Sequence, residues 1–190
     1  MTNVHGDLAE LAAAAQQGDR AALEQLLSRS RPQIFRYVLA RLVDRASAED
    51  VTQEVSIAVV SALPRYVDTG RSPLAWMFGI AQHKVSEAHR SGGRRRETTV
   101  DEVPDWHDDG RTSPDVAACE LETARELASL LDQLPAPQGE ILRLRIAAGL
   151  SAEETGAVLG MSAGAVRIAQ HRALTRLRAI LPKGGRHDVA

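Results

Sequence analysis

The sequence has few of the residues that stabilise disulfide-rich domains, sheets or membrane spans. A single cysteine, Cys119, occurs among 190 residues, which excludes an internal disulfide and a zinc site built from cysteines. Aromatic residues make up 3% of the chain against 44% for all hydrophobic residues, and no run of alternating β-branched residues stands out. No apolar stretch reaches the ~18 residues that a membrane crossing needs. These absences favour an all-α, cytoplasmic protein without membrane insertion.

Signals for export and for catalysis are also missing. The stretch MTNVHGDLAELAAAAQQGD has no basic flank and is interrupted by Asp7 and Glu10, so it does not predict a signal peptide. The chain has no Gly-rich phosphate loop, no metal-ligand cluster and no nucleophile motif, and His83 and His89 are poorly spaced as a ligand pair. We therefore expect no catalytic residues, no metal and no cofactor, and an enzyme is the least favoured function.

The formal net charge of −2 hides a strong segregation of charge. Acidic residues dominate TTVDEVPDWHDDGRTSPDVAACE, in the middle of the chain. Basic residues gather on both sides of that segment, at Lys84, Arg90, Arg94, Arg95 and Arg96 and again at Arg167, Arg172, Arg176, Arg178, Lys183 and Arg186. The net charge therefore does not argue against a nucleic-acid partner.

Helical periodicity covers most of the chain. It predicts separate helices in LAELAAAAQQ, in RAALEQLLSR behind a cap at Asp19, and in QIFRYVLARLV after Pro32. Further helices are predicted from Ser47 to Pro64, from Pro73 to about Arg90, and at roughly 116–133, 136–147, 152–159 and 163–181. Residues 98–115 are acidic and without period, which predicts a flexible linker reaching up to ~70 Å. We expect two small helical domains, 1–97 and 116–190, joined by this linker.

Two stretches begin alike, SAEDVTQEV at residues 47–55 and SAEETGAVL at residues 151–159. In each, a Ser followed three residues later by a carboxylate predicts a capping box at a helix start. The residues after the caps differ. Asp50, Gln53 and Glu54 share one face of the first helix, and a polar face of this kind is usually only solvated.

The stretch GLSAEETGAVLGMSAGAVRIAQHRALTRLR predicts a helix-turn-helix. Its first helix turns apolar residues inward and ends at Gly160, and Met161 and Val166 lie where the two helices meet. The second helix is expected to expose four residues near its N-terminal half, where such helices enter the major groove, namely Arg167, Gln170, His171 and Arg172. The alternative is an ordinary helical hairpin with a basic face.

These stretches carry a family resemblance. LDQLPAPQGEILRLRIAAGLSAEETGAVLGMSAGAVRIAQHRALTRLR resembles region four of the extracytoplasmic-function sigma factors, members of the sigma-70 family that direct bacterial RNA polymerase to promoters. SAEDVTQEVSIAVVSAL resembles the polymerase-clamp helix of region two, and WMFGIAQHKVSEAHRSGGRRR resembles its minus-ten helix. AHRSGGR and VRIAQHRAL resemble the actinobacterial type-D subgroup. The family often has Lys-Ser-Arg at 167–169 and Asn at 83, where this chain has Arg167, Ile168, Ala169 and His83.

The resemblance implies three sets of contact residues. The set that contacts core polymerase is Asp50, Gln53 and Glu54. The set implied for minus-ten promoter DNA is Tyr66, Asp68, Arg71, Trp76, Gln82, His83, Lys84, Glu87, Arg90, Arg94 and Arg95. The set implied for the minus-thirty-five element is Ser162, Gly164, Arg167, Gln170, His171, Arg172 and Arg176.

The resemblance also implies the partners. It points to a transcription initiation factor that binds core RNA polymerase at the β′ coiled coil and the β flap, binds promoter DNA, and is held by an anti-sigma partner. The alternative is a free-standing helix-turn-helix repressor or activator whose N-terminal domain senses a ligand or dimerises. Tight, specific binding of duplex promoter DNA by the chain alone would favour that alternative.

Overall fold

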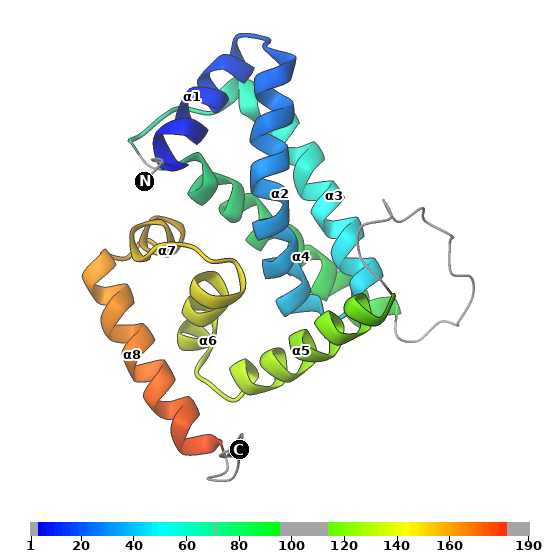
Figure 1. Ribbon diagram of the computed structural model, residues 1–190, viewed down its shortest axis with the longest axis vertical. Helices are drawn as coiled ribbons and strands as arrows, with labels where there is room; N and C mark the ends of the chain where they lie inside the picture. Colours follow the sequence, from blue (N-terminus) through cyan, green and yellow to red (C-terminus); the bar gives the residue numbers. More distant parts are fainter. Residues whose placement is uncertain (1–3, 71, 96–113, 182–190) are drawn as a thin grey trace, which may run out of the picture.

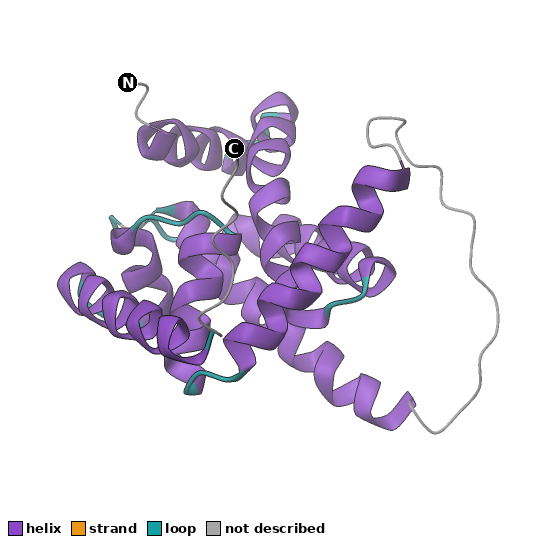
Figure 2. Cartoon of the chain, turned by 60° about the horizontal axis from the view of Figure 1, so that its bottom comes forward, coloured by secondary structure: helices purple, strands orange, loops and turns teal. Residues whose placement is uncertain are grey.

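The computed structural model describes residues 4–70, 72–95 and 114–181, and within them the chain is helical without strands (Figure 2). Short loops join most of the helices. The helices are α1 (Val4–Gln16), α2 (Arg20–Leu42), α3 (Arg45–Ala62), α4 (Pro73–Arg95), α5 (Pro114–Asp132), α6 (Ala136–Leu142), α7 (Ala152–Leu159) and α8 (Ala163–Ile180), with a 3₁₀ turn η1 (Leu63–Arg65) and a π-helical turn η2 (Arg143–Ala147). The all-α prediction is confirmed.

The first four helices pack around one core (Figure 1). Val38, Val55 and Phe78, one from each of α2, α3 and α4, are completely buried. The ring of Tyr37 meets the ring of Phe78 edge-on, with 5.5 Å between the centroids. Aliphatic side chains at helical spacing supply most of this core, which is how a chain with few aromatic residues fills it.

Helix α2 is a single helix of 23 residues, so the prediction of two helices separated at Pro32 is wrong. A proline inside a helix removes one backbone hydrogen bond and usually bends or ends it. Here the buried side chains Leu26 and Ile34 on both sides of Pro32 pack into the same core, and their burial keeps the helix continuous. The predicted cap at Asp19 is confirmed, since its carboxylate accepts from the backbone N–H groups of Ala21 and Ala22 at 2.9 and 3.1 Å.

Helix α3 begins before Ser47, so the predicted capping box at Ser47 and Asp50 is wrong. The N-cap is Asp44, whose carboxylate accepts from the backbone N–H of Ser47 at 2.8 Å. The preceding residue, Val43, has a φ of 58°, a left-handed conformation that ends α2 and turns the chain toward α3. The hydrogen bonds from the Ser47 hydroxyl and from the Ser47 backbone N–H hold the pKa of the Asp44 carboxyl below its usual value, although burial opposes them.

Helix α4 begins at Pro73 as predicted, and the Ser72 hydroxyl accepts from the backbone N–H of Leu74 at 3.3 Å. It ends at Arg95 and not near Arg90. Two glycines inside a helix lower its stability without forbidding helical backbone angles, which allows α4 to continue through Gly92 and Gly93. Residues 96–113, which hold most of the predicted acidic linker, lie outside the described residues.

The second half of the chain forms the predicted helix-turn-helix, α7 and α8, supported by α5 and α6. Ser151 and Glu154 form a full capping box, with hydrogen bonds of 3.0 and 2.6 Å, as predicted. Gly160 ends α7 with a φ of 68°. A Cβ on Gly156 would lie 2.5 Å from the Met161 carbonyl oxygen, so the turn passes close over α7. Val166 is fully buried between the helices.

The two halves pack against each other (Figure 1). Leu144, Ala148 and Leu150 belong to the same buried cluster as the core of the first four helices. The Nε of Arg36 on α2 donates to the Ala147 carbonyl oxygen at 3.1 Å. The sequence, which indicates two domains and a linker, does not predict this contact.

Candidate nucleic-acid and protein interfaces

The face of α3 that carries Asp50, Gln53 and Glu54 is exposed, and the three side chains lie on one side of the helix. Glu54 is also joined to α4, because its carboxylate lies 3.3 Å from the Lys84 ammonium nitrogen. The same side of α3 carries an apolar residue that sequence reasoning missed, Ile57, which is 58% exposed. Ile57 lies three residues after Glu54 and outside the buried apolar stripe of α3, so helical spacing alone could have predicted that it is exposed. A mixed polar and apolar surface of this kind suits a protein partner.

The outward side of α4 holds charged residues that pair with one another. The Lys84 ammonium lies 3.1 Å from the Glu87 carboxylate, which is also 3.5 Å from His83 Nδ1. Hydrogen bonds to Glu87 and to Glu54 raise the pKa of Lys84, and the bond from Lys84 in turn lowers the pKa of Glu87. His83 and Arg90 are exposed, as expected for residues that meet a partner.

The resemblance implies that Gln82 is an exposed residue of α4, and this expectation of exposure is wrong because Gln82 is half-buried. Its side-chain amide donates to the Glu140 carboxylate of α6 at 3.0 Å and is half-buried by the contact between the halves. The reason lies outside α4. Helical spacing places Gln82 on the outer side of an isolated α4, but α6 packs there.

The loop before α4 places two of the predicted residues in direct contact. The rings of Tyr66 and Trp76 lie 4.7 Å apart, and both are half-buried. Burial and the nearby Asp68 raise the pKa of Tyr66. Asp68 accepts from the backbone N–H of Gly70 at 2.8 Å, which closes a tight turn, and its neighbour Val67 is 73% exposed. Arg71 lies outside the described residues, as do the side chains of Arg94 and Arg95.

Helix α8 carries the predicted groove-reading residues, and the structure divides them into two groups. Arg167 is exposed but pairs with Glu153 of α7 at 2.5 Å. Gln170 is half-buried and accepts from Arg145 Nε at 2.9 Å, so the expectation that Gln170 is exposed is wrong. Arg145 belongs to η2, so the helical spacing of α8 alone cannot predict its contact with Gln170.

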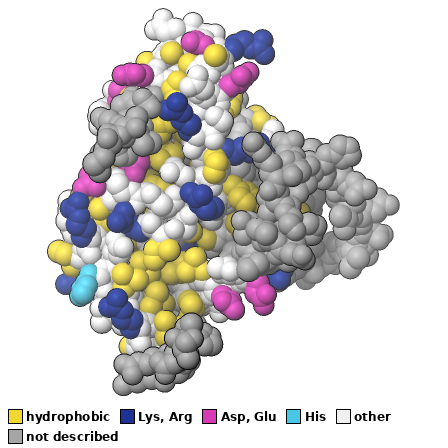
Figure 3. Space-filling view, in the orientation of Figure 1, with side chains coloured by type: hydrophobic (Ala, Val, Ile, Leu, Met, Phe, Trp, Pro, Cys, Tyr) yellow, Lys and Arg dark blue, Asp and Glu magenta, His cyan; other side chains and the backbone are white. Residues whose placement is uncertain are grey.

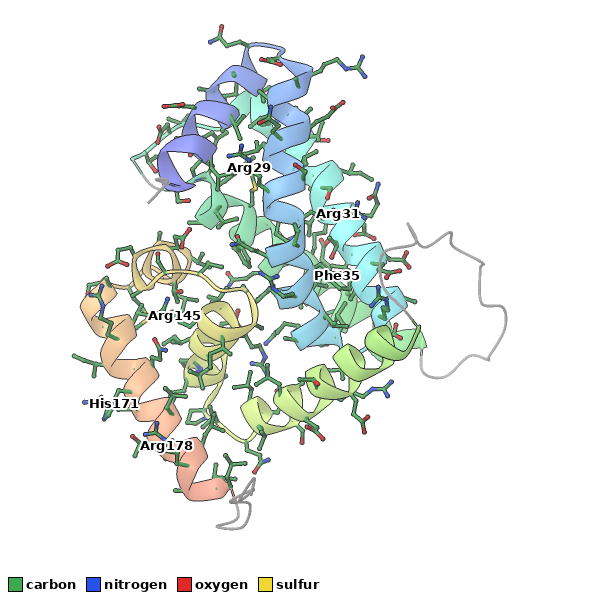
Figure 4. The ribbon with its side chains drawn as sticks, viewed as in Figure 1. Arg29, Arg31, Phe35, Arg145, His171 and Arg178 are labelled. Carbon is green, nitrogen blue, oxygen red and sulfur yellow. The ribbon has the colours of Figure 1, made fainter. Side chains whose placement is uncertain are left out.

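The remaining residues of α8 face outward. The Ser162 hydroxyl caps the helix by accepting from the backbone N–H of Ala165 at 3.2 Å. The residues that are exposed and belong to the predicted set are Ser162, Gly164, His171, Arg172 and Arg176. His171 leaves α8 on the side away from α6 (Figure 4), and basic side chains lie along this outer side of the molecule (Figure 3). Sequence reasoning missed Ile168, which is 57% exposed between these residues.

Other kinds of site find no support in the described ranges. Residues 4–70, 72–95 and 114–181 contain no group of three or more His, Cys, Asp or Glu side chains placed to hold a metal ion. None of the helices in these ranges has both the length and the apolar character to cross a membrane.

Comparison with known proteins identifies both halves. The family model "Sigma-70 region 2" matches residues 26–95, and "Sigma-70, region 4" matches residues 130–179. The ECF RNA polymerase sigma factor SigD of Mycobacterium tuberculosis is 49% identical over 171 residues, which cover 87% of this chain and 80% of that protein. ShbA of Streptomyces griseus, another ECF RNA polymerase sigma factor, is 47% identical over 174 residues, or 87% of this chain and 91% of that protein.

Two solved structures share the fold. CnrH, in complex with the cytosolic domain of CnrY, is 28% identical with a TM-score of 0.66, covering 90% of this chain and 94% of that chain. The sigma factor RpoE of Bartonella quintana, in complex with the anti-sigma factor NepR, is 22% identical with a TM-score of 0.58, covering 85% and 98%. At that identity the second likeness concerns the fold alone.

Proposed function

Because the chain belongs to the extracytoplasmic-function sigma factors, of the SigD type, and directs promoter-specific initiation by RNA polymerase, we propose residue roles for its two halves. Residues 1–97 bind core polymerase and the minus-ten element. Residues 116–190 bind the minus-thirty-five element and the β flap, and residues 98–115 connect them. The chain catalyses no reaction itself and works in the cytoplasm, where bacterial transcription takes place.

The surface formed by Asp50, Gln53, Glu54 and Ile57 docks on the β′ coiled coil of core polymerase. One observation carries this proposal: the side chains are exposed on one side of α3, which lies within the region 2 match. An exposed apolar residue surrounded by polar ones is typical of a protein contact, since the apolar centre supplies affinity and the polar rim supplies specificity.

Binding of core polymerase by purified variants tests this surface. We expect Asp50→Ala and Gln53→Ala to weaken the affinity for core enzyme about tenfold or more, while the urea unfolding midpoint stays unchanged because neither side chain is buried. Glu24→Ala, an exposed acid on α2, is the matched control and keeps full affinity. Unchanged affinity in both α3 variants would overturn the assignment.

For the minus-ten element we propose the loop and outer side of α4, with Tyr66, Asp68, Arg71 and Trp76 around an unstacked base. The remaining contacts to this DNA are Gln82, His83, Lys84, Glu87, Arg90, Arg94 and Arg95. Two aromatic rings in contact beside an exposed loop suit a base that has left the duplex, because such a base can pack on an aromatic side chain. Gln82 donates to Glu140 in this structure, so a contact between Gln82 and DNA requires that hydrogen bond to open.

For the minus-thirty-five element we propose the outer face of α8. Ser162 and Gly164 lie at the N-terminal end of α8. We expect Arg172 and Arg176 to contact phosphate groups of the DNA backbone. Arg167 and Gln170 reach the bases after releasing Glu153 and Arg145. His171 lies on the outward side of α8 (Figure 4), so it can contact DNA without first breaking a bond to another helix.

An anti-sigma factor is the remaining partner that we propose. The supporting observation is that CnrH, whose fold this chain shares, was solved with the cytosolic domain of CnrY, and Bartonella quintana RpoE with the anti-sigma factor NepR.

A further inference from the structure

An isoleucine occupies the centre of the outward face of α8. Val166 and Ala173 are fully buried and mark the inner side of the helix. At 3.6 residues per turn, Ile168 points roughly 200° away from Val166, nearly opposite the core. Its side chain is 57% exposed, while surface positions of a helix are usually polar.

The neighbours of Ile168 make its position more informative than an isolated surface isoleucine. One turn before it is Gly164, where a Cβ would meet no atom closer than the Ser162 hydroxyl at 4.0 Å, so packing does not require a glycine there. One turn after it are His171 and Arg172, both exposed. Ile168 therefore has a glycine without a side chain on one side. On the other side it has His171 and Arg172, whose side chains can bind the phosphates of a nucleic acid.

Two polar residues on the flanks of this face are already bonded within the chain. Arg167 pairs with Glu153, and Gln170 accepts from Arg145. Ile168, an exposed apolar side chain, has no such hydrogen bond or ion pair to break. A DNA groove can therefore contact Ile168 without breaking a bond inside the chain, whereas Arg167 and Gln170 must first release their partners.

We propose that Ile168 contacts the C5-methyl group of a thymine in the major groove and so selects an A·T pair in the minus-thirty-five element. The proposal rests on the function proposed above for α8. The thymine methyl is the one apolar group that a base pair presents in the major groove, and aliphatic side chains recognise it by contact. Basic side chains around Ile168 attract the phosphates that border such a groove.

Removing the methyl group from the DNA tests the proposal directly. A promoter found by transcription with the wild-type holoenzyme is prepared with single thymine-to-deoxyuridine changes at each thymine of the minus-thirty-five region, on both strands. Holoenzyme affinity is then measured for wild type, for Ile168→Ala, and for Ile180→Ala, a control three turns further along α8. We expect one deoxyuridine to weaken wild-type binding about fourfold, the value of one buried methyl group, and to have no effect with Ile168→Ala.

The outcomes separate this proposal from the function on which it rests. A holoenzyme that shows no preference for any minus-thirty-five sequence would contradict the proposed role of α8 itself. A sequence preference without a deoxyuridine penalty, or a penalty that persists in Ile168→Ala, would overturn only the methyl contact. Loss of core-enzyme affinity in Ile168→Ala would also overturn it, because the isoleucine would then face polymerase.

Discussion

The Tyr37 hydroxyl of α2 donates a hydrogen bond of 2.6 Å to the Glu140 carboxylate of α6, joining residues 103 positions apart. The same carboxylate accepts from Gln82 of α4 at 3.0 Å and pairs with Arg41 at 3.3 Å. Burial and the negative charge of Glu140 raise the pKa of Tyr37 far above its ordinary value, so the hydroxyl remains a donor at any physiological pH. One carboxylate of the second half thus gathers three donors of the first.

The Glu140 contacts are expected to stabilise the packing of the two halves. Glu140→Leu leaves the nearly buried Tyr37 hydroxyl and the amide of Gln82 without their acceptor, and we expect it to lower the free energy of unfolding by about 2–3 kcal/mol. Tyr37→Phe removes one hydrogen bond and should cost about 1 kcal/mol. Urea unfolding at pH 7 measures both, with Glu153→Gln in an exposed pair as the unaffected control. Equal stability of wild type and Glu140→Leu would contradict the arrangement.

The two Ser-Ala-Glu stretches should respond differently to the same substitution. Ser151→Ala removes the side-chain acceptor of a capping box and should destabilise the protein by about 1 kcal/mol. Ser47 donates both its backbone N–H and its hydroxyl to the Asp44 carboxylate, and Ser47→Ala removes only the second of these bonds, between two exposed residues, so it should cost clearly less than Ser151→Ala. Denaturant unfolding of Ser151→Ala and Ser47→Ala measures the two losses of stability. Equal losses at both positions would show that Ser47, and not Asp44, caps α3.

The cap at Asp44 makes a pH-dependent contribution to stability. Its carboxyl has a lowered pKa in the folded state, so its contribution is fully present above the unfolded pKa of about 3.9 and is lost as pH falls through the folded pKa. Asp44→Asn keeps a capping oxygen but does not titrate in this range. We therefore expect the stability difference between wild type and Asp44→Asn to shrink as the pH is lowered from about 5 to about 2. Urea unfolding of both proteins at each pH measures this difference. A difference that stays constant with pH would refute the cap.

Three glycines in the second half should respond to alanine in different ways. Gly160→Ala forces an L-residue to a φ of 68° and should cost about 1–2 kcal/mol. Gly156→Ala would push the Met161 carbonyl oxygen, 2.5 Å from the new Cβ, and should destabilise the turn. Gly164→Ala meets open space inside a helix and should stabilise by about 0.5–1 kcal/mol. Thermal unfolding of the three variants ranks their stabilities. A destabilising Gly164→Ala would show that neighbouring atoms crowd this position.

Local sequence predicts most helices here and misses what depends on distant partners. The capping box at Ser151, the turn at Gly160 and the inward Val166 follow from residues within a few positions of each other. The start of α3 was missed although its signal was also local, because Asp44 competes with Ser47 as a cap.

The candidate sites show the same limit. Asp50, Gln53 and Glu54 lie together as helical spacing requires. The spacing of α4 and α8 cannot show that Gln82 meets Glu140 or that Gln170 meets Arg145, because both partners come from other elements. The continuity of α2 through Pro32 likewise depends on a core built by other helices.

Transcription with purified core RNA polymerase from the same organism and fragmented genomic DNA tests the central claim most directly. We expect the chain to produce run-off transcripts from a limited set of start sites that core enzyme alone does not use. These sites should share sequence elements near minus ten and minus thirty-five. Transcripts no more abundant than the core-only background, with the chain folded and in excess, would contradict the assignment as a promoter-directing sigma factor.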